Sequence, residues 1–336
     1  MDMPLRRLGN TGVKVSALCF GTMTFGSQWK QIGTTGQHEA DEIVARCLDA
    51  GINFFDTADV YSNGESEEIL GRALGERRRD VIVATKVRGR MSGAPNDVGL
   101  SRHHILESVD ASLRRLGTYW IDLYQVHCWD ALTPLEETLR ALDDCVRWGK
   151  VRYIGASNFA GWQLMKALAV SERAGLERFV TLQPLYNLML RDVENELVPV
   201  CRDQGLGILP WSPLAGGFLT AKYRRGTQPP AGTRRSMAQE QFLRFDEERG
   251  QDVVEALADI AASHGGTVAQ AALNWLLAKP WVSAVIVGAR TREQLDDDLG
   301  AVKWSLTPAE AERLDAMTPP PRVYPNWFIA MSHERR

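Results

Sequence analysis

The chain of 336 residues lacks the cysteine pattern of a disulfide-stabilised or zinc-binding protein. It has five cysteines, an odd number at long spacings, and no C-x-x-C pair occurs. The pair His103-His104 has no cysteine or carboxylate at ligand spacing, so we predict no metal site. Free thiols in a reducing compartment fit this pattern better than a disulfide framework.

Long apolar runs and a large excess of one charge are also missing. No apolar stretch approaches the ~18 residues of a membrane span, and residues 1–7 lack the apolar core of a secretory signal. The net charge of −3 offers no general attraction for nucleic acid or an anionic membrane. We therefore predict a cytoplasmic protein with neither partner, and its oligomeric state stays open.

Short apolar runs rich in β-branched and aromatic residues alternate with helix-like segments along most of the chain. We predict strands over residues 17–20, 52–55, 81–85, 121–125, 151–155, 180–183, 206–210 and 282–287. Helices are predicted over residues 38–50, 65–76, 101–116, 134–148, 160–174, 192–204, 250–264, 267–279, 291–301 and 308–316. Strands that are apolar throughout and separated by crossover helices indicate a parallel sheet covered on both faces.

This alternation predicts one α/β domain over residues 1–336, a single TIM-type (β/α)8 barrel. An N-terminal hairpin is expected around residues 8–12, an extra helix before the eighth strand, and a proline-rich tail at 319–325. A long loop over residues 214–248 breaks the alternation, and loops of that length are usually functional. The alternative is an open doubly wound sheet, but no G-x-G-x-x-G follows the first strand.

Titratable side chains lie at or just past the ends of three consecutive strands. Asp56 and Tyr61 follow the second strand, Lys86 follows the third and His127 the fourth. Neighbouring barrel strands open on the same mouth, so these groups are expected to converge there. Each residue alone has an ordinary structural explanation, as a cap, a surface lysine, a packing ring or a buried histidine. Four of them at three successive strand ends favour a catalytic explanation.

These four residue types suit reduction of a carbonyl, in which carbon receives a hydride and oxygen receives a proton. A tyrosine of pKa ~10 is a weak acid unless its pKa is shifted, and a nearby ammonium favours the phenolate. We expect Tyr61 to be the general acid and Lys86 to tune it. Asp56 would hold Lys86 charged, and a neutral His127 would orient the substrate oxygen.

The chain resembles the aldo-keto reductases, on the side of aryl-alcohol dehydrogenases and bacterial general reductases. Residues 51–61 read G-I-N-F-F-D-T-A-D-V-Y, followed by Gly64, the pair Ser66-Glu67 and the pair Leu70-Gly71, which is similar to the family signature. Further signatures appear in the expected order, at Thr85-Lys86, at residues 122–127 and at residues 155–159. The resemblance implies the same catalytic tetrad, Asp56, Tyr61, Lys86 and His127.

The resemblance also implies that a nicotinamide dinucleotide lies extended across the barrel mouth. Asp56 faces this cofactor, and the carboxamide is held by Ser157, Asn158 and Gln183. Trp211 stacks on the nicotinamide ring. The implied pyrophosphate contacts are Ser212, Pro213, Leu214, Ala215, Gly216 and Lys222. Thr22 and Met23 supply backbone contacts near the ribose.

The adenosine end is implied at residues 288–298. Gly288, Arg290 and Gln294 match this motif at a strand tip and a helix N-terminus, which is a natural phosphate site. Arg290, alone or with Arg292, supplies charge for a 2′-phosphate, which favours NADPH over NADH. Asp298 stands where the family usually has Asn, so it lacks an amide donor and adds charge beside Asp296 and Asp297.

Three tryptophans give a hypothesis about the substrate. Trp29, Trp129 and Trp327 fall in predicted loops or the tail near the mouth, where they would line a pocket for aromatic or bulky carbonyls. Ordinary packing of these loops is the alternative.

The leading prediction is an NADPH-dependent reductase of aldehydes or ketones that also runs toward alcohol oxidation. A second hypothesis is a cofactor-binding regulatory subunit, because potassium channel β-subunits resemble the chain too. Those subunits carry Asn at the position of His127, which favours an enzyme here. A third is a secondary-alcohol dehydrogenase that uses NADP+, since the same groups serve both directions.

Overall fold

A closed ring of parallel strands forms the centre of the computed structural model, which describes residues 3–29, 33–223, 225, 226, 228, 233 and 243–331. In spatial order the strands are β10 (Val285–Val287), β3 (Leu18–Gly21), β4 (Phe54–Asp56), β5 (Ile82–Val87), β6 (Ile121–Val126), β7 (Val151–Ser157), β8 (Phe179–Gln183) and β9 (Gly207–Ile208). A parallel bridge between Ile208 and Val282 joins the two ends of this order. The predicted (β/α)8 barrel is therefore confirmed.

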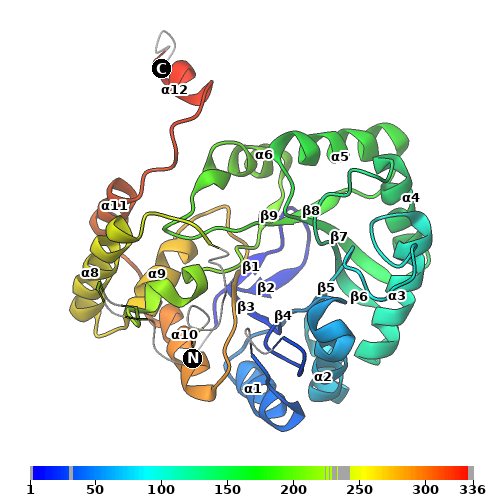
Figure 1. Cartoon of the computed structure of the whole chain (residues 1–336), viewed down its shortest axis with the longest axis horizontal. Coiled ribbons are helices and arrows are strands. Elements are labelled where there is room, and N and C mark those ends of the chain that lie inside the picture. The colour runs from blue at the N-terminus through cyan, green and yellow to red at the C-terminus, as the bar shows by residue number, and fades with distance from the viewer. Residues whose placement is uncertain are drawn as a thin grey trace.

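Helices surround the strands, and each crossover returns the chain to the same end of the barrel (Figure 1). They are α1 (Gln37–Asp49), α2 (Glu65–Leu74), α3 (Arg102–Leu116), α4 (Leu135–Arg147), α5 (Gly161–Ala174), α6 (Leu197–Gln204), α8 (Glu247–His264), α9 (Val268–Leu277), α10 (Arg292–Gly300), α11 (Pro308–Met317) and α12 (Asn326–Met331). In α3 the ends follow ordinary capping: Ser101 accepts the His104 N–H at 3.2 Å, and Gly117 ends the helix at φ +60°.

Two helical segments differ from the prediction. The helix expected over residues 192–204 is a short 3-10 turn (Asp192–Glu194) followed by α6. Pro199 explains the break, because proline is tolerated in a first turn but would disrupt a longer helix running through it. The unpredicted α12 follows the proline-rich tail and stands away from the barrel (Figure 1). The loop predicted over residues 214–248 lies partly outside the described residues.

Apolar side chains form two cores, one between strands and helices and one inside the barrel. The inner core consists of Leu8, Val15, Cys19, Phe54, Ala84, Leu123, Leu209, Ala284 and Ile286. Its first two members come from the predicted hairpin, which pairs β1 (Leu5–Arg7) with β2 (Lys14–Ser16). Gly9 in the hairpin turn has φ +56°, and a Cβ there would lie 2.3 Å from the Val180 carbonyl oxygen. The hairpin thus closes one end of the barrel and leaves the other as the mouth.

Because side chains alternate along each strand, the face that lines the inner core continues up to the mouth of the barrel. Residues two apart share one face of a strand. The inner residues Phe54, Ala84 and Leu123 are therefore followed, on the same face, by Asp56, Lys86 and Gln125. Buried polar groups thus replace apolar ones near the carboxyl ends of the strands, where a barrel enzyme carries its site. Within the described part of the chain, no helix is long and apolar enough to cross a membrane.

Candidate active site

The four predicted catalytic residues come together at the barrel mouth. The Lys86 Nζ donates to Asp56 Oδ1 at 2.5 Å, to the Thr57 carbonyl oxygen at 2.7 Å and to Tyr61 Oη at 3.3 Å. The ring of His127 lies edge-on to the ring of Tyr61, with centroids 5.8 Å apart. The ammonium therefore links a carboxylate to a phenol whose other neighbour is an imidazole.

The Asp56 carboxylate is held by two amides in addition to Lys86. Gln183 Nε2 donates to Asp56 Oδ2 at 2.8 Å, and Gln125 Nε2 donates to the same oxygen at 3.1 Å. Sequence reasoning missed Gln125 as a site residue. The signal was an amide inside a fully buried strand, two residues before His127 and so on the same face.

A strained turn brings Tyr61 back over the barrel. The two residues after it, Ser62 and Asn63, have φ values of 46° and 54°, which non-glycine residues seldom adopt. The start of α2 holds this turn, because Ser66 Oγ lies 3.0 Å from Thr57 Oγ1 and both are buried. The strained turn keeps the tyrosine ring at the site instead of in a regular helix.

Burial and charge set the protonation states of the site. Burial disfavours the Lys86 ammonium, but the charges and hydrogen bonds of Asp56 and Tyr61 together outweigh burial, and the pKa of Lys86 is raised. Burial raises the pKa of Tyr61, and the opposing effect of Lys86 is smaller. The expected influence of the ammonium is thus present, but it does not bring the tyrosine pKa below its ordinary value, because the charge of Lys86 is already matched by Asp56. The phenol is neutral and holds its proton.

His127 is held in the neutral form. Burial, followed by the charges of Lys86 and Arg88, lowers the pKa of His127 to about 3. Its backbone is fixed on both sides: its N–H donates to the Val87 carbonyl at 2.9 Å, and its carbonyl accepts from Asn158 Nδ2 at 2.9 Å. A neutral imidazole beside a neutral phenol gives two donors for one oxygen atom.

The residues predicted for the carboxamide end also lie together. Ser157 Oγ donates to the Gln183 carbonyl oxygen at 2.8 Å. Asn158, at φ 53°, accepts from the Trp211 indole N–H at 3.0 Å. These contacts join the ends of β7, β8 and β9 into one polar rim next to His127.

The predicted phosphate loop, residues 212–216 with Pro213 and Leu214 inside it, turns tightly after β9. Ser212 and Ala215 adopt φ values of 53° and 50°, and Ser212 Oγ accepts from the Gly216 N–H at 3.1 Å. Lys222 lies against this loop, since a Cβ on the next residue, Gly217, would meet its Nζ at 2.4 Å. The Lys222 ammonium thus lies against a loop in which Ser212 and Ala215 adopt left-handed backbone conformations.

The predicted adenosine end lies beside the loop that follows β3. The Arg290 N–H donates to Gln294 Oε1 at 2.9 Å, and the N-cap of α10 is Thr291. Thr24 Oγ1 donates to the Ala289 carbonyl at 3.3 Å. This contact places the segment with Thr22 and Met23 next to the segment with Gly288 and Arg290.

The three acids of α10 differ in environment. Asp296 pairs with Arg46 at 2.6 Å, and Asp297 accepts from Thr267 Oγ1 at 2.8 Å. Asp298 is only 5% exposed, and burial, followed by the charge of Asp297, raises its pKa to about 8. Three negative charges therefore do not face the predicted nucleotide site together.

The three tryptophans of the substrate hypothesis lie in different surroundings. The Trp29 ring lies 5.6 Å from the Tyr61 ring. Trp129 packs edge-on against Phe159 at 5.4 Å, at the start of α5. Trp327 lies in α12, 39% exposed, and its recorded ring contacts are with other tail residues. The structure brings only Trp29 of these three into ring contact with a tetrad residue.

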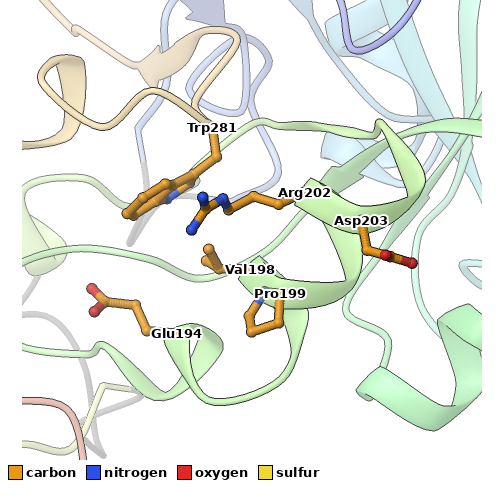
Figure 2. Close-up of a pocket in the computed structure, with 6 residues that line it drawn as sticks. All are labelled: Glu194, Val198, Pro199, Arg202, Asp203 and Trp281. Carbon is orange, nitrogen blue, oxygen red and sulfur yellow. The ribbon is translucent and has the colours of Figure 1, made fainter. Parts of the chain in front are cut away.

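A separate pocket of about 470 Å³ lies on the flank of the barrel at α6 (Figure 2). Its lining residues are Glu194, Val198, Pro199, Arg202, Asp203 and Trp281. The Arg202 guanidinium lies over the Trp281 ring at 5.6 Å, and Glu194 accepts from Arg191 at 2.8 Å. No tetrad residue lines this pocket, so it is distinct from the site at the mouth.

Comparison with known proteins agrees with this geometry. Residues 17–319 match the model of the Aldo/keto reductase family. The chain is 36% identical over 343 residues to a versiconal hemiacetal acetate reductase of Aspergillus parasiticus, covering 96% of this chain and 99% of that one. It is 39% identical over 324 residues to a probable voltage-gated potassium channel subunit beta of Arabidopsis thaliana, covering 93% and 96%. A putative aryl-alcohol dehydrogenase of Schizosaccharomyces pombe is 34% identical over 335 residues, covering 92% and 93%. The resemblance read from the sequence is confirmed.

Proposed function

Because the chain belongs to the aldo/keto reductase family, we propose that it reduces aldehydes or ketones to alcohols with NADPH, reversibly. The observation that carries this proposal is the contact of the Lys86 ammonium with both Asp56 and the Tyr61 hydroxyl. This contact gives a neutral phenol beside a fixed positive charge, which suits a general acid that must become a phenolate.

The roles of the residues follow from their protonation states. When bound, NADPH supplies a hydride to the carbonyl carbon. The carbonyl oxygen accepts hydrogen bonds from Tyr61 and from the neutral His127, and it takes the Tyr61 proton as the carbon receives the hydride. Lys86 then stabilises the phenolate that is left, and the tyrosine regains its proton from solvent. Preorganised donors aimed at the developing alkoxide lower the barrier most.

The donor set at the mouth fits a nicotinamide dinucleotide. Asn158 and Gln183 offer amide oxygens and nitrogens, and Ser157 a hydroxyl, for a carboxamide. Lys222, which lies against the turn at residues 212–216, offers an ammonium for a pyrophosphate. Arg290, next to the first turn of α10, offers a guanidinium for a 2′-phosphate, which favours NADPH.

The substrate is expected to be aromatic or bulky where it meets Trp29, which contacts the ring of Tyr61. Trp129 and Trp327 remain part of this hypothesis only if the loops rearrange around a ligand. A Trp29→Ala variant with unchanged preference between benzaldehyde and propanal would remove the aromatic wall from the proposal.

A regulatory subunit is the second candidate, and similarity to a potassium channel subunit beta favours it. The neutral His127 beside Tyr61 supports the enzyme instead. An NADP+-dependent secondary-alcohol dehydrogenase differs only in direction, which an assay of both directions decides.

The test is a panel of carbonyls and alcohols with both cofactors, followed through the absorbance of reduced nicotinamide. Tyr61→Phe should lose about 10²-fold or more of turnover, as expected for loss of a general acid, while still binding NADPH. Tyr119→Phe is the matched control, since Tyr119 is 91% exposed. Turnover unchanged in Tyr61→Phe would refute the general acid. NADPH binding without turnover of any panel member would favour the regulatory candidate.

A further inference from the structure

An arginine follows the catalytic lysine by two residues at the end of β5. Arg88 has φ 131°, a backbone conformation that a non-glycine residue seldom adopts. Two backbone hydrogen bonds hold this place: the His127 N–H donates to the Val87 carbonyl at 2.9 Å, and the Gly99 N–H to the Arg88 carbonyl at 3.1 Å. Arg88 is therefore held alongside His127 in spite of backbone strain.

Among the residues that the structure describes, none forms an ion pair with the guanidinium of Arg88. Its Nε is buried without a hydrogen bond. Its charge is one of the causes that lower the pKa values of His127 and Asp130, and it opposes the effect of burial, which raises the pKa of Cys128. The guanidinium therefore lies near these residues. A partly buried cation without a partner is unfavourable and is unusual for arginine.

Asp130, an acid on which the charge of Arg88 acts, is engaged elsewhere. The oxygens of Asp130 accept from the Leu100 N–H at 2.8 Å, from Thr133 Oγ1 at 2.7 Å and from the Leu132 N–H at 3.0 Å. Asp130 is thus satisfied by Leu132 and Thr133 of its own loop and by Leu100 of another. The positive charge of Arg88 remains available to a group that enters the mouth.

Lys86 cannot serve an entering anion. Its ammonium is fully buried and bonds Asp56, Thr57 and Tyr61. Arg90, the next cation along the chain, is exposed and donates to the carbonyls of Ser92 and Ala94. Arg88 is thus a single uncompensated charge beside His127, which suits a singly charged group better than a dianionic phosphate. The planar fork of a guanidinium matches a carboxylate in particular.

We propose that Arg88 binds a carboxylate of the substrate, so that the preferred substrates are carbonyl compounds carrying a carboxylate. This inference rests on the proposed reductase function and names its substrate class. Arg88 then sets specificity, while Tyr61 and His127 act on the carbonyl oxygen.

The experiment compares a charged aldehyde with a neutral one of the same shape. The pairs are 3- and 4-carboxybenzaldehyde with methyl 3- and 4-formylbenzoate, assayed at saturating NADPH and constant ionic strength. The readout is the ratio of kcat/KM for acid over ester. In wild type the ratio should exceed one for at least one pair. In Arg88→Gln it should fall about tenfold or more, as expected for loss of a charged hydrogen bond.

Three further variants separate charge from structure. Arg88→Lys should keep part of the ratio because it keeps the charge. Arg88→Gly relieves the positive φ and should lose the ratio as fully as Arg88→Gln. Arg90→Gln is the control and should leave the ratio at the wild-type value. A ratio unaffected at Arg88, or an equal loss for acid and ester, overturns the inference.

Binding measured without turnover keeps this inference separate from the proposed function. The probe is 4-(hydroxymethyl)benzoate, titrated by tryptophan fluorescence into the NADPH complex, with the methyl ester as the neutral comparison. The acid should bind more tightly than the ester in wild type, and Arg88→Gln should remove that difference. Failure of turnover with this difference present counts against the reductase alone, and absence of the difference overturns the role of Arg88. A weaker affinity of Arg88→Gln for NADPH itself would place Arg88 at the cofactor and overturn the inference as well.

Discussion

The buried carboxyl of Asp298 allows a quantitative prediction of stability against pH. Asp298 lies in α10, 5% exposed, and its pKa rises from 3.8 to about 8 because of burial and the neighbouring charge of Asp297. Between these two pH values the unfolded chain releases a proton that the folded chain keeps. The free energy of unfolding therefore falls as pH rises through this window, and the contribution of Asp298 is fully present only below pH 3.8.

The magnitude follows from the linkage relation. Each pH unit inside the window removes about 1.4 kcal/mol, so that at pH 7 the cost of Asp298 reaches at most about 4 kcal/mol. Asp298→Asn keeps the shape of the side chain but never ionises. The stability of this variant relative to wild type should therefore increase by about 1.4 kcal/mol per pH unit up to about pH 8 and level off above it.

Urea unfolding of the nucleotide-free protein between about pH 5 and pH 9 measures this difference, with the fluorescence of its ten tryptophans as the signal. Asp297→Asn is a useful companion, because it keeps an oxygen acceptor for Thr267 but removes the charge that raises the pKa of Asp298. In Asp297→Asn, the pH range over which the free energy of unfolding falls should therefore end at a lower pH than in wild type. A stability difference between Asp298→Asn and wild type that stays constant with pH would refute the reasoning.

Two further predictions concern the cofactor and the histidine. Arg290→Ala should weaken NADPH binding by about tenfold or more and NADH binding far less, as expected for loss of a charged hydrogen bond to the 2′-phosphate. Arg292→Ala is its control, since Arg292 pairs with Asp296 on the same helix; equal losses for NADPH and NADH in Arg290→Ala would exclude this role. With the pKa of His127 lowered to about 3, kcat/KM for a neutral aldehyde at saturating NADPH should show no acid limb near pH 6.5. Such a limb, if abolished in His127→Gln, would show that the imidazole titrates in the working range.

The positions of the strands and of the site residues along the chain were predictable. They are determined by the spacing of apolar residues and by the residue types at the ends of strands and helices. Apolar runs that finish in polar residues mark the strand ends, and this pattern predicts that Asp56, Lys86 and His127 lie at one mouth. The break in the helix over 192–204 could also have been read, from Pro199, by asking where a proline fits in a first turn. Gln125 was missed because an amide in a buried strand is informative only once its face is known.

Protonation states were not predictable, because they depend on burial that no local pattern shows. The sequence indicated a tyrosine acidified by lysine, but in the folded chain burial of Tyr61 exceeds the influence of an ammonium already matched by Asp56. Burial also raises the pKa of Asp298, but there it changes whether the side chain can donate a hydrogen bond. As an ionised acid it would lack the donor of an amide, but with a pKa of about 8 its carboxyl keeps a proton that it can donate near neutral pH.

The charges at the mouth explain how β5 and the residue after it can serve both carbonyl reduction, through Lys86, and the choice of substrate, through Arg88. Lys86 and Asp56 cancel each other, and Tyr61 and His127 are neutral, so the four proposed catalytic groups carry almost no net charge toward a ligand. Neutral donors suit a carbonyl oxygen, which becomes negative only as the reaction proceeds. In our proposal the attraction of a charged substrate then rests with Arg88, which lies two residues from Lys86 and has no ion pair within the described residues. A change at Arg88 should therefore alter which carbonyl compound is bound while leaving the ion pair between Lys86 and Asp56 intact, whereas a change at Lys86 or Asp56 leaves its partner buried without its ion pair.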